Sequence, residues 1–183
     1  MQADSPSTGN AGDHAGLQIR QRNDADFEQL EIIARRVQTA DRYPIYLPDG
    51  DYRRFLSKPA SISAWVATLA DEVVGHVALN DSTSEPVMRA VEELGDERPA
   101  LYIARLLVDP NARRTGSGRA LLDHARREAL SSGHLPALDV VDIPTAAPAI
   151  SLYRAEGWRE IARVSFDLGD LHLDEIVFID PAR

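Results

Sequence analysis

The stretch LYIARLLVDPNARRTGSGRALLDHARREAL, residues 101–130, decides the fold of this 183-residue chain. Residues 102–108 form an apolar run with Arg105 as its only charge, which predicts a strand. Asp-Pro-Asn at 109–111 predicts the turn that ends this strand. Small and apolar residues then recur at helical spacing over 118–129, so a helix should follow. The order is therefore strand, glycine-containing loop and helix.

The loop between strand and helix, Arg113-Arg114-Thr115-Gly116-Ser117-Gly118, has the composition of an anion site. Its two glycines let backbone N–H groups approach a ligand closely. The first turn of the next helix adds unpaired N–H donors and the positive end of the helix dipole. Phosphate is the natural ligand for such a site. The chain lacks both the GxGxxG pattern of a Rossmann unit and the Lys-Ser/Thr pair of a Walker loop, so neither site is predicted.

Composition limits the classes of protein that need to be considered. With 44% hydrophobic residues over 183 positions, the chain can bury one sizeable core, and a single domain is expected. A net charge of −9 argues against nucleic acid or an anionic membrane as the main partner. The absence of cysteine excludes disulfides, thiolate nucleophiles and cysteine metal sites, and it agrees with a cytoplasmic location. No apolar run reaches the ~18 residues of a membrane span.

The N-terminal half predicts a tail, a strand–helix pair and a hairpin. Residues 1–16 are polar and rich in Gly, Ser and Asp, which predicts a disordered tail before one domain over 17–183. Leu17 to Arg20 alternate as a strand does, and Asn23 to Asp26 supply capping groups for a helix with an apolar stripe. Residues 62–69 and 73–80 predict an antiparallel hairpin.

Two less regular segments flank that hairpin. Residues 39–59 carry three tyrosines, a glycine, and prolines at positions 44 and 48, which predicts an ordered loop with a short helix at 49–56. Residues 81–99 predict an excursion whose small helix, at 87–94, lies on the body of the domain.

The C-terminal part predicts a parallel step followed by a hairpin. A strand at 136–141, reached through the crossover helix, completes a right-handed βαβ unit. Thr145 should cap another helix, which Gly157 closes. Strands at 158–166 and 171–179 finish the chain. The last of these apolar strands could lie inside the sheet or pair across a homodimer.

A second motif, Leu152-Tyr153-Arg154-Ala155-Glu156-Gly157-Trp158, follows the predicted strand at 136–141. Together with the Arg-x-x-Gly-x-Gly loop after a strand ending in Val-Asp-Pro, it makes the sequence resemble the GCN5-related N-acetyltransferase (GNAT) family from Leu17 to Asp180. The resemblance implies a mixed α/β (α+β) fold of the acyl-CoA N-acyltransferase kind. In that fold a central, mostly antiparallel sheet has a parallel βαβ step at strands four and five.

The same resemblance implies an activity and a cofactor site. Acetyl-coenzyme A is the expected co-substrate, an amine the acceptor, and no metal is expected. In the family the pantetheine arm pairs with the fourth strand, which here places Leu106, Leu107 and Val108 along it, with the Leu106 N–H at the thioester carbonyl. The loop residues Arg113, Arg114, Thr115, Gly116, Ser117 and Gly118 would hold the pyrophosphate. Tyr153 would protonate the departing thiolate.

The acceptor side is less defined by the sequence. Tyr43 and Tyr46 are candidates for substrate selection, because the family's acceptor pocket is walled by the corresponding segment, and His76 is a candidate on the neighbouring strand. Where family members often carry a strand glutamate as general base, this chain has Tyr102, and an unperturbed phenol with a pKa near ~10 is a poor base. Water, His76, Asp142 or an acceptor of low pKa are the alternatives.

Two further points remain open from the sequence. The chain has Ala146 where the family often has an asparagine seven residues before the tyrosine, so one cofactor or water-bridging hydrogen bond is expected to be missing. Because the glutamate is missing, an alternative function also remains open, that of a coenzyme A-binding sensor or partner-binding module without turnover. The identity of the acceptor amine does not follow from the sequence.

Overall fold

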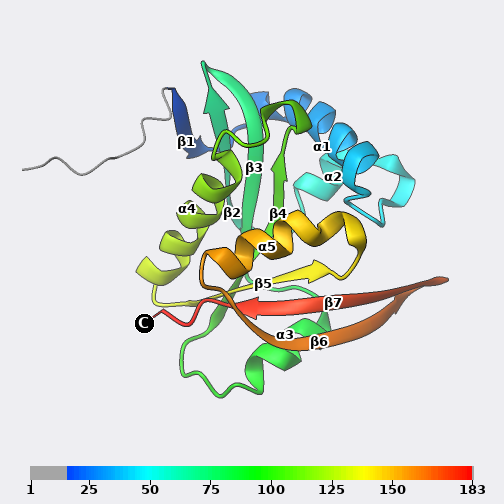
Figure 1. Cartoon of the computed structure of the whole chain (residues 1–183), viewed down its shortest axis with the longest axis vertical. Helices are drawn as coiled ribbons and strands as arrows, with labels where there is room; N and C mark the ends of the chain where they lie inside the picture. The colour runs from blue at the N-terminus through cyan, green and yellow to red at the C-terminus, as the bar shows by residue number, and fades with distance from the viewer. Residues whose placement is uncertain (1–15, 183) are drawn as a thin grey trace, which may run out of the picture.

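The computed structural model describes residues 16–182, which build a seven-stranded sheet with helices on both faces (Figure 1). The strands are β1 (Leu17–Gln21), β2 (Ser61–Leu69), β3 (Glu72–Asn80), β4 (Ala100–Val108), β5 (Leu135–Val141), β6 (Arg159–Leu168) and β7 (Leu171–Ile179). The helices are α1 (Phe27–Asp41), α2 (Tyr52–Leu56), α3 (Glu85–Glu92), α4 (Ser117–Ser131) and α5 (Ala147–Ala155). Within this described range, no helix is long and apolar enough to cross a bilayer.

The order of the strands is β1-β2-β3-β4-β5-β7-β6. All neighbours are antiparallel except β4 and β5, which run parallel because α4 crosses over between them. This confirms the predicted mixed, mostly antiparallel sheet with its parallel step at strands four and five. β7 lies between β5 and β6, so residues 171–179 are inside the sheet, which is one of the two arrangements that the sequence allowed.

The helices divide between the two faces of the sheet. On the α4/α5 face, Leu121 of α4 and Tyr153 of α5 pack in one cluster with Leu79 and Ile103 of the strands. On the other face, α1 and α2 pack against residues that include Val66 and Leu107, and α3 packs against residues that include Tyr102 and Val177. We call this second side the α1–α3 face. Figure 1 shows α4 and α5 in front of the sheet, whereas α1, α2 and α3 lie behind it.

Local sequence signals account for most of the helix ends. Asn23 forms the predicted cap: its side chain accepts from the N–H of Ala25 at 2.9 Å, and the Asp26 carboxylate accepts from the N–H of Asn23 at 2.8 Å. Two expectations were wrong. The short helix begins at Tyr52 rather than at residue 49, because Asp49 has a left-handed φ of 58°. Thr145 does not cap α5, because its hydroxyl donates to the carbonyl of Asp41 at 2.6 Å.

The predicted tail at residues 1–16 lies, apart from Gly16, outside the described residues. The other elements begin and end within two or three residues of the predicted positions.

Candidate active site

The centre of the candidate site is the edge of β4 that faces β5. Pairing between these strands ends at Ile103 with Leu138, although β4 continues for five more residues. At the same point the register between β3 and β4 shifts, and Arg105 has a positive φ of 52°. Such a bulge bends one strand away from its neighbour. In Figure 1, β1–β4 run vertically whereas β5–β7 run across the view, so the two halves of the sheet diverge here.

Backbone direction along β4 shows which amides face this open edge. The N–H of Asp109 donates to the carbonyl of Val74 in β3 at 2.8 Å. Because N–H groups alternate in direction along a strand, Leu107 also points its N–H towards β3, whereas Leu106 and Val108 point theirs away from it. The amide expected at the thioester carbonyl, that of Leu106, therefore lies on the edge that pairs with no strand beyond Ile103. Leu107 instead contributes a fully buried side chain under α1.

His76 holds the bulge in place. Its imidazole is fully buried, with Nδ1 3.0 Å from the carbonyl oxygen of Arg105 and Nε2 3.1 Å from Nη1 of Arg22. A guanidinium can only donate, so Nε2 must accept and Nδ1 must carry the hydrogen. Burial, with the charges of Arg22 and Arg105 adding to it, lowers the pKa of His76 to about 3. This geometry does not support His76 as acceptor contact or base, because its only basic nitrogen is already occupied.

The burial of neutral His76 predicts a pH-dependent stability. Unfolded chains take up a proton on this histidine below about pH 6.5, whereas the folded protein takes it up only near pH 3. The free energy of unfolding should therefore fall by about 1.4 kcal/mol for each pH unit below 6.5. The free energy of unfolding, measured with urea at several pH values between 6.5 and 3, should depend less steeply on pH for His76→Gln than for the wild type. The same pH dependence in the two proteins would contradict the assignment.

The loop after β4 is ordered by side-chain hydrogen bonds within it and by an ion pair with α1. The Asp109 carboxylate accepts from the N–H of Asn111 at 2.9 Å and pairs with Arg36 at 2.7 Å. The Thr115 hydroxyl donates to the carbonyl of Ala112 at 2.8 Å and lies 2.7 Å from the hydroxyl of Ser117. Ordering the loop in advance lowers the entropic cost of binding a ligand there.

Two glycines expose backbone at the start of α4. Gly116, the residue before the helix, has a left-handed φ of 84°, which other residues adopt only at a cost. A Cβ on Gly118 would make only an ordinary 3.5 Å contact with Val108, so packing within the protein does not require glycine there. The first four N–H groups of a helix have no partner within it, and the positive end of the helix dipole lies beside them. This arrangement can bind a phosphate group.

The arginines near this loop differ in their surroundings. Arg113 forms an ion pair with Asp41, and Arg119 forms one with Glu156 at 2.7 Å. Arg114 makes no hydrogen bond or ion pair with the other residues from 16 to 182. Of the three, Arg114 is the guanidinium that a bound anion could recruit without breaking an existing pair.

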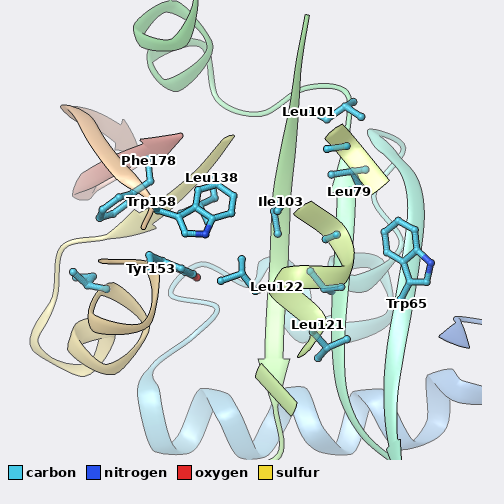
Figure 2. Close-up of a cluster of buried hydrophobic side chains, with 14 of the residues drawn as sticks. Trp65, Leu79, Leu101, Ile103, Leu121, Leu122, Leu138, Tyr153, Trp158 and Phe178 are labelled. Carbon is cyan, nitrogen blue, oxygen red and sulfur yellow. The ribbon is translucent and has the colours of Figure 1, made fainter. Parts of the chain in front are cut away.

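Tyr153 reaches the open edge from the other side. Figure 2 shows its ring below those of Trp158 and Phe178, with the hydroxyl pointing away from α5 towards the strand that carries Ile103. The ring centroids lie 6.5 Å from Trp158 and 5.8 Å from Phe178. The hydroxyl makes no hydrogen bond within the described part of the chain. Burial raises the pKa of Tyr153, so the phenol stays protonated and can donate at neutral pH.

The candidate acceptor residues do not converge. Tyr43 packs edge-on against Phe55, with 5.8 Å between the centroids, and burial raises its pKa to about 12. Tyr46 is 53% exposed on the surface. Asp142, named as one alternative base, is engaged in an ion pair with Arg163. The charge of Arg105 on β4 acts on both Tyr43 and His76.

Sequence reasoning missed three charged residues on the α1–α3 face: Arg105, Asp139 and Glu175. Arg105 is 5% exposed, and its guanidinium lies 5.5 Å from the ring centroid of Phe55. Asp139 of β5 is half-buried and Glu175 of β7 is 7% exposed. For Arg105 and Asp139, a single charge inside an otherwise apolar strand was the available signal, since such charges are rarely buried without a function or a partner.

Comparison with known proteins gives one family match. The sequence model of the Acetyltransferase (GNAT) family matches residues 27–158, which include β4, the glycine loop and α5. No curated protein matches the chain in a sequence search.

Solved structures share the fold. Arabidopsis thaliana NAA60 in complex with acetyl-CoA has a TM-score of 0.66 at 22% identity, over 90% of this chain and 98% of that chain. The ribosomal-protein-S18-alanine N-acetyltransferase from Escherichia coli has a TM-score of 0.62 at 17% identity, over 89% and 92%. The ribosomal-protein-alanine N-acetyltransferase from Brucella melitensis has 0.64 at 21%, over 89% and 98%. At these identities the likeness is one of fold.

Proposed function

Because the chain belongs to the GNAT acetyltransferase family, we propose that it transfers an acetyl group from acetyl-coenzyme A to a primary amine by direct attack in a ternary complex. One observation carries the proposal. Within residues 16–182, the edge of β4 that faces β5 pairs with no strand beyond Ile103, and it runs from the Leu106 amide to the glycine loop at the start of α4. An extended ligand with an anionic end could pair along this edge and place its phosphates at the helix terminus.

Each part of the edge has a separate task in this proposal. The amides of Leu106 and Val108 pair with the extended arm of the cofactor, and the N–H of Leu106 stabilises the charge that develops on the thioester oxygen. The N–H groups at Gly116 to Gly118 bind the pyrophosphate, with the Arg114 guanidinium adding charge. The Tyr153 hydroxyl, which makes no hydrogen bond with residues 16–182, donates a proton to the departing sulfur.

Direct attack is preferred to a covalent route on chemical grounds. An acyl-enzyme route through a thiolate would need a cysteine, and none occurs in the 183 residues. The amine must then reach the thioester while both substrates are bound. Holding the two reactants together in this way supplies much of the rate acceleration by removing the entropy of encounter.

The lack of cysteine also makes the test simple. Coenzyme A released by the reaction carries a thiol, so a thiol-reactive dye reports turnover without any background from the protein. A panel should contain a free amino acid, a polyamine, a peptide with a free N-terminal alanine and an N-blocked peptide with one lysine. We expect release of coenzyme A above the hydrolytic background with at least one amine, and mass spectrometry should find the acetamide product.

A negative panel would be informative if calorimetry is carried out in parallel. Binding of acetyl-coenzyme A with no turnover on any amine would favour the coenzyme A-binding module over the enzyme. Absence of both binding and turnover would refute the use of the β4 edge as a cofactor site.

A further inference from the structure

The parts proposed so far include no group that takes the proton of the acceptor amine. Asp139 and Glu175 lie on neighbouring strands where β4 and β5 separate. Asp139 pairs in register with Val177, and Val141 pairs with Glu175, so the two carboxylates are diagonal neighbours. Ala137 and Val177 belong to the α3 cluster, and residues alternate along strands, so both carboxylates are on the α1–α3 face.

Glu175 is buried and Asp139 is half-buried, and in the described part of the chain both lack the ion-pair partners that such charges usually have. Glu175 is 7% exposed, and its Oε2 atom has no hydrogen-bond partner among residues 16–182. Asp139 accepts a long hydrogen bond, 3.3 Å, from the hydroxyl of Thr83. Neither forms an ion pair within the described chain. Burying a carboxylate in this way destabilises a fold, which favours a role in binding a ligand.

Arg105 is a third incompletely paired charge beside them. Its Nε atom is buried without a partner, and Nη1 reaches only Ser61 and Asn80, each at 3.4 Å. Its charge acts on Asp139 and helps to keep that carboxylate ionised. The charge that acts on the Glu175 carboxyl is the negative charge of Asp139, and no positive group in residues 16–182 acts on it comparably. In this pair, Asp139 supplies a negative charge and Glu175 supplies a carboxyl group that can take up and release a proton.

The pair also lies within electrostatic reach of the proposed acid. The negative charge of Asp139 contributes to the raised pKa of Tyr153 on α5 and to that of Tyr43 in the α1–α2 connection. These two tyrosines come from opposite faces of the sheet. Asp139 directly follows Leu138, the last β5 residue paired with β4, so it lies where the two strands separate and where an acceptor on the α1–α3 face would meet a thioester held along β4.

We propose that Asp139 and Glu175 bind the ammonium group of the acceptor and remove its proton, in place of the strand glutamate that the chain lacks at Tyr102. This inference rests on the proposed acetyl transfer. It implies an acceptor that arrives as a cation, such as an alkylammonium or a peptide N-terminus.

The proton balance of the step is simple. One proton passes from R–NH₃⁺ to the carboxylate pair, and the neutral amine forms the C–N bond with the thioester carbon. The C–S bond breaks, the sulfur takes a proton from Tyr153, and the amide nitrogen loses its second proton as Tyr153 is restored. The carboxyl proton returns to solvent, so one proton is released for each acetamide and coenzyme A formed.

Burial raises the pKa values of both carboxyl groups towards the pH at which an enzyme assay is carried out. It raises the pKa of Glu175 to about 8, with the charge of Asp139 adding to the shift, and it raises the pKa of Asp139 as well. Two interacting carboxyls titrate as a pair, so the raised values describe the pair rather than either residue alone. The other titratable, charged or hydrogen-bonding groups that act on the pair or respond to it are Tyr43, Lys58, Thr83, Tyr102, Arg105 and Tyr153.

The test compares Glu175→Gln and Asp139→Asn with Asp174→Asn, a carboxyl beside Glu175 on β7 that is exposed on the opposite side of the strand. With the most active amine of the panel, wild-type kcat/KM should rise with pH through an inflection near 8. Both site variants should lose that inflection and about 10²-fold in kcat/KM at neutral pH. Their affinity for acetyl-coenzyme A, measured by calorimetry, should not change, and Asp174→Asn should behave as the wild type does.

A second acceptor separates proton removal from structural support. With a fluorinated alkylamine, which is already neutral at the assay pH, the defect of both variants should shrink to a few fold. An equal defect with both amines would overturn the role as base, and so would wild-type profiles in both variants. If the wild type acetylated no amine at all, the proposed function would fail and this inference with it.

Discussion

Tyr153→Phe is expected to lower kcat by about 10²-fold or more while leaving the affinity for acetyl-coenzyme A nearly unchanged, if Tyr153 protonates the leaving thiolate. The substitution removes one oxygen and keeps the ring that packs against Trp158 and Phe178. Because the hydroxyl makes no hydrogen bond within residues 16–182, its loss should leave the thermal midpoint unchanged. Steady-state kinetics, calorimetry and thermal unfolding measure these three quantities.

Tyr52→Phe is the matched control for this variant. Tyr52 is equally buried, but it lies under α1, and its hydroxyl donates to the side chain of Gln38 at 2.5 Å. Its replacement should therefore reduce stability by about 1 kcal/mol and leave turnover unchanged. Full turnover in Tyr153→Phe would mean that Tyr153 serves only in packing, and would remove the proposed acid.

Gly116→Val is expected to abolish measurable binding of acetyl-coenzyme A. A β-branched side chain at this position would keep the pyrophosphate away from the N–H groups at the start of α4. Hydrogen bonds to a charged group contribute about 1.5–3 kcal/mol each, so losing two of them corresponds to a decrease in affinity of about 10²-fold or more. Calorimetry with acetyl-coenzyme A and with coenzyme A would measure the effect.

Gly133→Val separates this effect from backbone strain. Gly133 lies just beyond the other end of α4 with a φ of 79°, close to the 84° of Gly116, and a Cβ there would meet nothing within 4 Å. Both variants should lose a similar ~1–2 kcal/mol from the left-handed conformation, but only Gly116→Val should lose binding. Unchanged affinity in Gly116→Val would refute the assignment of the pyrophosphate to this loop.

Local signals account for what could be predicted of the cofactor side. The apolar run at 102–108, the glycines at 116 and 118, and the Tyr153 motif each belong to one continuous segment, and each has a local physical meaning. A strand's apolar pattern, a glycine before a helix and a helix stop can all be identified without knowing what packs on them. The loop, the helix and the aromatic ring are accordingly found where the sequence predicted them.

Long-range contacts account for what was missed. The sequence left His76 as one of several alternative bases, but its role depends on Arg22 and Arg105, which are 54 and 29 residues away. Thr145 was predicted to cap α5, but its hydroxyl donates to the carbonyl of Asp41, which is 104 residues away. A hydrogen bond of this kind is decided by three-dimensional proximity, which local propensity does not contain.

The sequence by itself determined the order of the elements, the parallel step between β4 and β5, the glycine-containing loop before α4 and the family, because periodicity, glycine positions and motifs are local properties of the chain. Only the tertiary structure decided the bulge at Arg105, the burial of His76 and the meeting of Asp139 with Glu175. These residues come from different strands, and their protonation depends on burial and on neighbouring charges that exist only once the sheet has formed.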